Sequence, residues 1–212
     1  MSLAAWLDAA AIAAYATLLL ELTVFPIPSE ASTWQLLAAR GGDTSTPGAA
    51  ALQRVQATAR SRRVLTLLLP TALGVLAWLV PLLLVVLPSW RPAFCVPMPD
   101  AVVVVGIVAI GLGRAITFGS VLQLRAAKRH ERLPGGLFRH SRNPGLVGMY
   151  VCYLGLMLGY GLPLLAIVLP LYLGNMHRRV RLEEAQLDFA HGASWRDYAA
   201  RVPRYLPFPG LR

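Results

Sequence analysis

The chain alternates between long apolar stretches and shorter segments rich in charge. Residues 64–89 contain no charged side chain, residues 101–122 contain only Arg114, and residues 3–27 contain two acidic side chains. A helix needs about 20 mostly apolar residues to cross a bilayer. The pattern therefore predicts three membrane helices at these positions. No positively charged segment precedes the first stretch, which favours a membrane helix over a signal peptide there.

A fourth apolar stretch, residues 145–175, is too long for one comfortable crossing and is interrupted at residues 159–163 by Gly-Tyr-Gly-Leu-Pro. Glycine and proline are the strongest local breakers of regular structure. We predict a hairpin of two short helices, 146–159 and 163–176; the alternative is one long kinked helix. The expected fold class is all-α, a polytopic helical membrane protein with about five transmembrane helices and a cytoplasmic pocket.

The distribution of positive charge favours the hairpin. Basic residues cluster in 40–63, 125–142 and 178–212, whereas only Arg91 lies between the second and third apolar stretches. Basic loops stay on the cytoplasmic side of a membrane. Five crossings place all three clusters in the cytoplasm with the N-terminus outside, and four crossings would put the basic tail on the opposite side.

Composition agrees with a membrane protein, because 56% of the residues are hydrophobic and 14% are charged. The net charge of +10 fits loops that meet anionic lipid headgroups. Basic patches interleaved with aromatic residues are absent from the sequence, so we expect membrane lipids and no nucleic acid as partners. The alanine-, arginine- and leucine-rich usage suggests a bacterial cytoplasmic membrane. Cys95 and Cys152 show no zinc spacing and are not expected to form a disulfide.

Two ionisable side chains lie inside the apolar stretches. Arg114 lies within the third span, toward its cytoplasmic end, where it is expected to snorkel or pair locally, and Glu21 is a possible partner. The connector 29–63 is either structural or a gate for substrate, with an interfacial helix possible over residues 49–63. Trp195 and Tyr198 are expected to anchor the tail at the membrane interface.

Two segments carry residues suited to chemistry. Gly135 and Gly136 permit close backbone approach, and Pro144 is well placed to begin a helix, whose free N–H groups can bind an anion. Arg179 and Glu183 are spaced four residues apart and share a helix face. The spacing alone favours an ordinary surface ion pair. The helix continues from a membrane span, however, and ionisable groups at membrane depth are functional candidates.

Together these motifs resemble the isoprenylcysteine carboxyl methyltransferase family, within a wider group of integral-membrane phospholipid and small-molecule methyltransferases. The resemblance covers about residues 115–208. The motifs that carry it are Gly136-Leu137-Phe138, Arg142-Asn143-Pro144, Arg179 with Glu183-Glu184, Phe189-Ala190-His191-Gly192 with Trp195 and Tyr198, and Val202-Pro203 with Leu206-Pro207. Asn143 stands where histidine is commoner, and Leu146 where the family usually has tyrosine.

The resemblance implies S-adenosylmethionine as cofactor, bound by the half of the chain from residue 115 to 212, with acceptor specificity in residues 1–114. It implies catalytic roles for Arg179, facing the methyl acceptor, and Glu183. Implied cofactor contacts are Gln123, His130, Leu133, Phe138, Arg142, Asn143, Pro144, Gly145, Leu146, Glu183 and Glu184.

Three functions follow as hypotheses. The first is a membrane methyltransferase acting on a lipophilic small molecule or a lipid-modified substrate, through a carboxylate, amine or thiol. The second is an NADPH-dependent reductase of the sterol type, whose C-terminal helices are similar but whose chains are usually longer. The third is a non-catalytic membrane protein; a transporter is disfavoured because no inverted repeat is visible.

Overall fold

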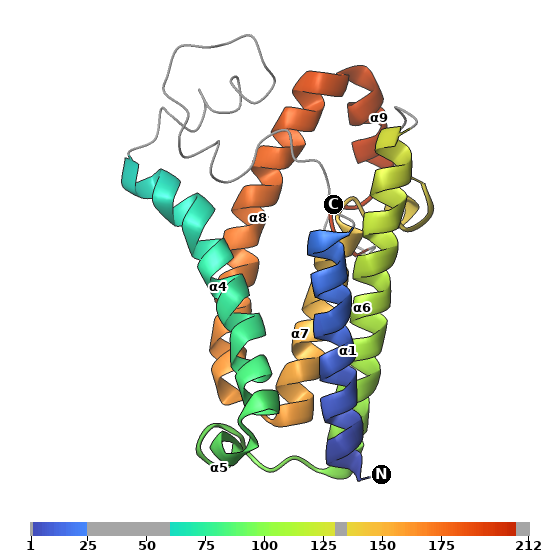
Figure 1. The fold of residues 1–212 in the computed structure, drawn as a ribbon. Helices are drawn as coiled ribbons and strands as arrows, with labels where there is room; N and C mark the ends of the chain where they lie inside the picture. The colour runs from blue at the N-terminus through green and yellow to red at the C-terminus, as the bar shows by residue number, and fades with distance from the viewer. Residues whose placement is uncertain (1, 25–59, 130–134, 207–212) are drawn as a thin grey trace. The chain divides into compact units, whose positions relative to one another are not determined.

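The computed structural model describes residues 2–24, 60–129 and 135–206, and all regular structure within them is helical (Figure 1). This confirms the predicted all-α class. In chain order the elements are α1 (Leu3–Thr23), α4 (Arg60–Val86), the 3-10 helix η1 (Pro88–Trp90), α5 (Arg91–Phe94), α6 (Asp100–Arg129), the 3-10 helix η2 (Gly136–Arg139), α7 (Pro144–Tyr160), α8 (Pro163–His191) and α9 (Ala193–Arg201).

Two of the described helices, α1 and α6, are long and apolar enough to cross a membrane. A third crossing results if Ala72–Val86 and Pro88–Phe94, which are bent by 107° at the break between them, form one span. The predicted second span continued to residue 89, but α4 ends at Val86. Helical geometry is disfavoured immediately before a proline, and Pro88 therefore ends the helix early.

The predicted hairpin is confirmed at the level of helices, because α7 and α8 are separate. Gly161 ends α7 in a left-handed conformation (φ +60°), and the Leu162 N–H donates to the Met157 carbonyl at 3.0 Å. A Cβ on residue 161 would collide with the Val96 carbonyl oxygen, and the Val96 N–H donates to the Gly161 carbonyl at 2.8 Å. One long kinked helix is thus excluded.

By their contacts the described residues divide into two compact units. The first comprises residues 2–24, 77–129, 135–169 and 202–206, and the second comprises residues 60–76 and 170–201. Both α4 and α8 contribute to each unit. The boundary expected at residue 114 separates acceptor specificity from cofactor binding and does not refer to compact units. It stays a prediction. Each unit is described on its own below.

In the first unit α6 and α7 pack antiparallel through glycines that bring their backbones together. A Cβ on Gly113 would overlap the backbone of Cys152 and lie 2.6 Å from the Gly148 carbonyl oxygen. A Cβ on Gly155 would lie 2.6 Å from the Ile110 nitrogen. Small residues permit such close approach between membrane helices. The packing sets the start of α7 beside the C-terminal half of α6.

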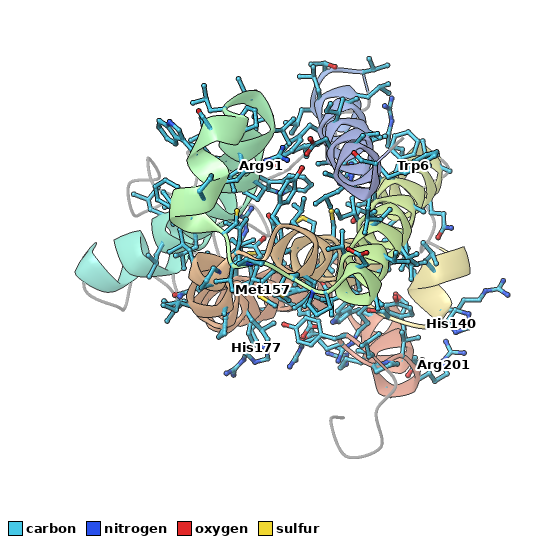
Figure 2. All side chains as sticks on the ribbon, turned by 90° about the horizontal axis from the view of Figure 1, so that it is seen from below. Trp6, Arg91, His140, Met157, His177 and Arg201 are labelled. Carbon is cyan, nitrogen blue, oxygen red and sulfur yellow. The ribbon has the colours of Figure 1, made fainter. Side chains whose placement is uncertain are left out.

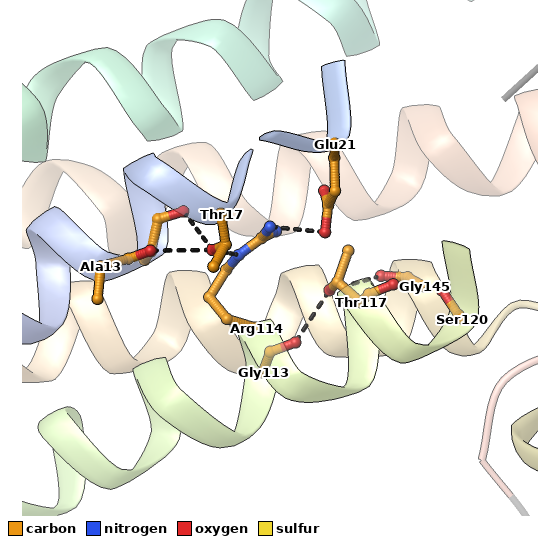
Figure 3. A network of polar contacts seen from close by, with 9 residues as sticks. Ala13, Thr17, Glu21, Gly113, Arg114, Thr117, Ser120 and Gly145 are labelled. Atoms are coloured by element: carbon orange, nitrogen blue, oxygen red, sulfur yellow. Dashed lines mark hydrogen bonds and ion pairs between the residues drawn. The ribbon is translucent and has the colours of Figure 1, made fainter. Parts of the chain in front are cut away.

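Helix α1 is tied to the rest of this unit by two ion pairs. Asp8 Oδ1 accepts from Arg91 Nη2 at 2.7 Å and from the Tyr160 hydroxyl at 2.8 Å. Glu21 Oε1 accepts from Arg114 Nη2 at 2.7 Å, as the sequence suggested (Figure 3). Arg114 lies near the middle of α6, because the helix runs on through polar residues to Arg129. Its expected place toward the cytoplasmic end of a membrane span stays a prediction.

In the second unit, α4 approaches α8 at Gly74. A Cβ on Gly74 would lie 3.2 Å from the Tyr172 ring. Trp195 and Tyr198 of α9 are buried, with ring centroids 5.4 Å apart. Their expected place at the membrane interface stays a prediction.

Candidate functional site

Gln123 of α6 holds the loop before α7 in place through a hydrogen bond. The Leu137 N–H donates to Gln123 Oε1 at 2.8 Å. Gly136 has φ +62°, and a Cβ there would lie 2.7 Å from both polar atoms of the Gln123 carboxamide. Position 136 therefore requires glycine twice over, for its backbone conformation and for the space that the carboxamide fills.

The loop encloses an apolar set of side chains. Phe138 and Leu146 are each 9% exposed, and Pro144 is also buried. Leu137 packs on α6, where a Cβ on Gly119 would lie 3.5 Å from Leu137 Cδ1. The burial of these apolar side chains holds the loop against α6.

The C-terminal segment docks on the same loop, which sequence reasoning did not foresee. The Arg142 N–H donates to the Pro203 carbonyl at 2.9 Å. Arg204 offers its carbonyl to two side chains, Asn143 Nδ2 at 3.0 Å and the Ser141 hydroxyl at 3.4 Å. We call residues 202–204 the C-terminal strap; its first residue, Val202, is 8% exposed.

The start of α7 has free donors. Pro144 is the first helical residue, as predicted, and the Val147 N–H donates to the Asn143 carbonyl at 3.1 Å. Among the described residues, the N–H groups of Gly145 and Leu146 have no acceptor. The Asn143 side chain, well suited to capping, makes no capping bond. Two backbone donors and the positive end of the helix dipole are thus left for an anionic group.

The structure brings most of the predicted cofactor residues together in the first unit. These are Gln123, Phe138, Arg142, Asn143, Pro144, Gly145 and Leu146. His130 and Leu133 lie outside the described residues. Two of the polar side chains, however, bond to the protein backbone: Gln123 to the loop and Asn143 to the strap.

The remaining predicted residues lie on α8 in the second unit. Arg179 Nε and Glu183 Oε1 are 3.2 Å apart, so the predicted pairing along the helix is confirmed. The two side chains are 29% and 51% exposed, and a pair of this kind has only a small effect on stability. Glu184 is partly buried. The geometry matches an ordinary surface ion pair, so a catalytic role for these side chains stays a prediction.

No metal centre is formed by the histidines that the structure describes. His140 follows η2 and is exposed at its edge (Figure 2), and His191 at the end of α8 is exposed as well. Within the described parts of the chain, no three side chains of His, Cys, Asp or Glu come together as a metal ion would need.

Comparison with known proteins adds no assignment. No protein-family model, curated protein or solved structure matches this chain. The resemblance of the motifs to membrane methyltransferases therefore stands as a prediction.

Proposed function

We propose that this chain is an integral-membrane methyltransferase that uses S-adenosylmethionine to methylate a lipophilic acceptor. The observation that carries the proposal is the uncapped start of α7, where Gly145 and Leu146 offer two N–H donors beside a loop fixed on α6. The order and spacing of the motifs around this loop, from Gly136 to the strap, support the same reading.

The donor set fits the polar parts of that cofactor. The N–H groups of Gly145 and Leu146 suit its carboxylate, and the apolar surroundings of Phe138 suit its adenine. The resemblance adds Glu183, whose carboxylate can pair with the cofactor ammonium through charge-assisted hydrogen bonds. When bound, S-adenosylmethionine supplies a methyl group activated on a sulfonium. The work left to the protein is to align the acceptor and to exclude water.

We further propose that α1, α4, α6, α7 and α8 all cross the membrane, with the N-terminus outside and the C-terminus in the cytoplasm. The apolar length of α1 and α6 supports membrane insertion. The 17 residues of α7 span about 26 Å as a helix, slightly less than a typical hydrocarbon core. This arrangement keeps all three basic clusters on one side, in what we take to be a bacterial cytoplasmic membrane.

The acceptor is proposed to reach the protein from the bilayer. Its reacting group is a carboxylate, amine or thiol on a lipophilic small molecule or a lipid-modified substrate. The resemblance directs Arg179 toward this acceptor, where a guanidinium can hold an oxyanion through two N–H groups. An acceptor that is already anionic needs no general base.

Binding of labelled S-adenosylmethionine to the purified protein in lipid nanodiscs tests the proposal. Saturable binding is expected, and Glu183→Gln should weaken it about ten- to hundredfold, which corresponds to losing one charge-assisted hydrogen bond. Asp188→Asn is the matched control, because Asp188 on the same helix forms an ion pair with the exposed Arg196 at 3.4 Å. Saturable binding of NADPH in place of S-adenosylmethionine, or binding of neither, would overturn the proposal.

Transfer is tested separately with a tritiated methyl group and a membrane lipid extract. Label is expected in the organic phase only when the protein is present, and Arg179→Ala should remove transfer while cofactor binding stays within about threefold of wild type. A parallel loss of cofactor affinity in this variant would contradict the role proposed for Arg179.

A further inference from the structure

We infer that Asn143 anchors the C-terminal strap and does not contact a ligand, although the resemblance implies a cofactor contact there. Its side-chain Nδ2 donates to the Arg204 carbonyl at 3.0 Å. The neighbouring Arg142 N–H and Ser141 hydroxyl bond to the strap as well. The part of this inference that concerns ligand affinity rests on the proposed function; the part that concerns the strap does not.

Asn143 has two competing sets of partners. It occupies the N-cap position of α7, where an asparagine side chain commonly accepts from the N–H of the second or third helical residue. Here those residues are Gly145 and Leu146, whose N–H groups have no acceptor in the described chain. Because the amide is turned to the Arg204 carbonyl, it leaves those donors free.

Several contacts hold the strap in place, so that the Arg204 carbonyl stays within reach of the Asn143 side chain. Three hydrogen bonds join residues 141–143 to it, and Val202 is buried at its base. If the strap leaves, the Asn143 side chain loses its acceptor and is free to cap α7. A capped α7 offers one donor fewer to an anionic ligand. Docking of the strap and availability of the helix start are therefore linked through one side chain.

Two substitutions at residue 143 separate anchoring from direct contact. Asn143→Asp cannot donate to the Arg204 carbonyl but caps a helix as well as asparagine does, so S-adenosylmethionine binding should weaken at least tenfold. Asn143→Ala also loses the strap bond but cannot cap, so binding should stay within about threefold of wild type. Equal, large losses in both variants would show that Asn143 contacts the ligand.

A readout without ligand follows the strap itself. Trypsin cleaves after Arg204, and both substitutions should speed this cleavage several-fold because the strap is held less firmly. Asn175→Ala is the matched control, since Asn175 Nδ2 also donates to a backbone carbonyl, that of Leu171 at 2.8 Å, but within α8. Cleavage at wild-type rates in both Asn143 variants would overturn the anchoring role, whether or not the protein binds S-adenosylmethionine.

A double substitution tests the link between strap and helix start. Val202→Asp places a charge at the buried base of the strap and should release it, so that trypsin cleaves faster and ligand binding falls several-fold. Adding Asn143→Ala should restore binding while the strap stays released, because no side chain is then left to cap α7. A double variant that binds no better than Val202→Asp alone contradicts the proposed competition, and thermal unfolding of each variant identifies any general loss of fold.

Discussion

Arg114 of α6 and Glu21 of α1 form an ion pair of 2.7 Å inside two apolar helices, with side chains only 6% and 9% exposed. Arg114 Nε also donates to the Thr17 hydroxyl oxygen at 3.0 Å (Figure 3). The guanidinium carbon lies 5.7 Å from the centre of the Trp78 ring, a cation–π distance. Charges at such a position are tolerated because each neutralises the other and because hydrogen bonds accompany them.

Removing one member of this pair should be strongly destabilising. Glu21→Ala leaves the Arg114 guanidinium buried without its counter-charge, and breaking buried pairs in this way costs about 3–5 kcal/mol. Denaturant unfolding in detergent measures the change. Asp197→Ala, which removes an exposed acid on α9, should change stability by less than about 0.5 kcal/mol. A double variant with Arg114→Leu should recover part of the loss; no recovery would mean that the pair is not what stabilises the two helices.

Two neighbouring glycines of α6 should respond in opposite ways to alanine. A Cβ on Gly113 would overlap the α7 backbone, whereas a Cβ on Gly111 meets no atom of the described chain within 4 Å. Gly113→Ala forces α6 and α7 apart and should cost more than about 1–3 kcal/mol. Gly111→Ala should be neutral or gain up to about 1 kcal/mol from helix propensity. Thermal unfolding of both variants measures their stability. Equal changes in stability would contradict the close contact between α6 and α7 at Gly113.

Those glycines also show which features of the fold the sequence does not predict. Apolar length predicted α1, α6 and the break between α7 and α8, because helix formation in an apolar segment depends on local composition. The possible partnership of Glu21 and Arg114 followed from the scarcity of charge in those spans. Gly111 and Gly113, by contrast, look alike in sequence, and only the packing of α7 distinguishes them.

The helix start at the candidate site was predictable from the sequence, but the hydrogen bonds around it were not. The motif containing Asn143 and Pro144 located the helix start, since proline at the first helical position has a local cause. The docking of the strap depends on backbone carbonyls of Pro203 and Arg204, which leave no signature in side-chain identity. The same holds for the bond from the Leu137 N–H to Gln123, where the side chain was predicted but its partner was not.

Cys95 reports both topology and local environment. It lies between α5 and α6, partly exposed, whereas Cys152 is fully buried. If α6 crosses the membrane as proposed, a membrane-impermeant maleimide should label Cys95 in intact cells. Arg139→Cys, exposed in η2, which follows α6 in the chain, should be labelled only after the membrane is opened. Labelling of both positions from the same side would exclude the proposed crossing.

The same thiol should react slowly at neutral pH. Burial raises the pKa of the Cys95 thiol, and the nearby Arg91 guanidinium offsets part of that rise. Because only the thiolate reacts, the labelling rate should increase with pH and stay below that of an exposed cysteine introduced as Ser89→Cys at every pH below the raised pKa. Equal rates for the two cysteines at pH 7 would show that Cys95 is not shielded.

Gly136 and Gly135 form a matched pair for testing the loop. Gly136→Ala strains a backbone at φ +62°, which costs about 1–2 kcal/mol, and displaces the Gln123 carboxamide from the Leu137 N–H. A Cβ on Gly135 meets no described atom within 4 Å, and its φ of −102° suits any residue. Gly136→Ala should therefore weaken S-adenosylmethionine binding at least tenfold and expose the loop to proteolysis, while Gly135→Ala should bind and resist cleavage like wild type. If both variants keep a protected loop and full affinity for S-adenosylmethionine, the hydrogen bond between Gln123 and the loop does not shape the proposed binding site.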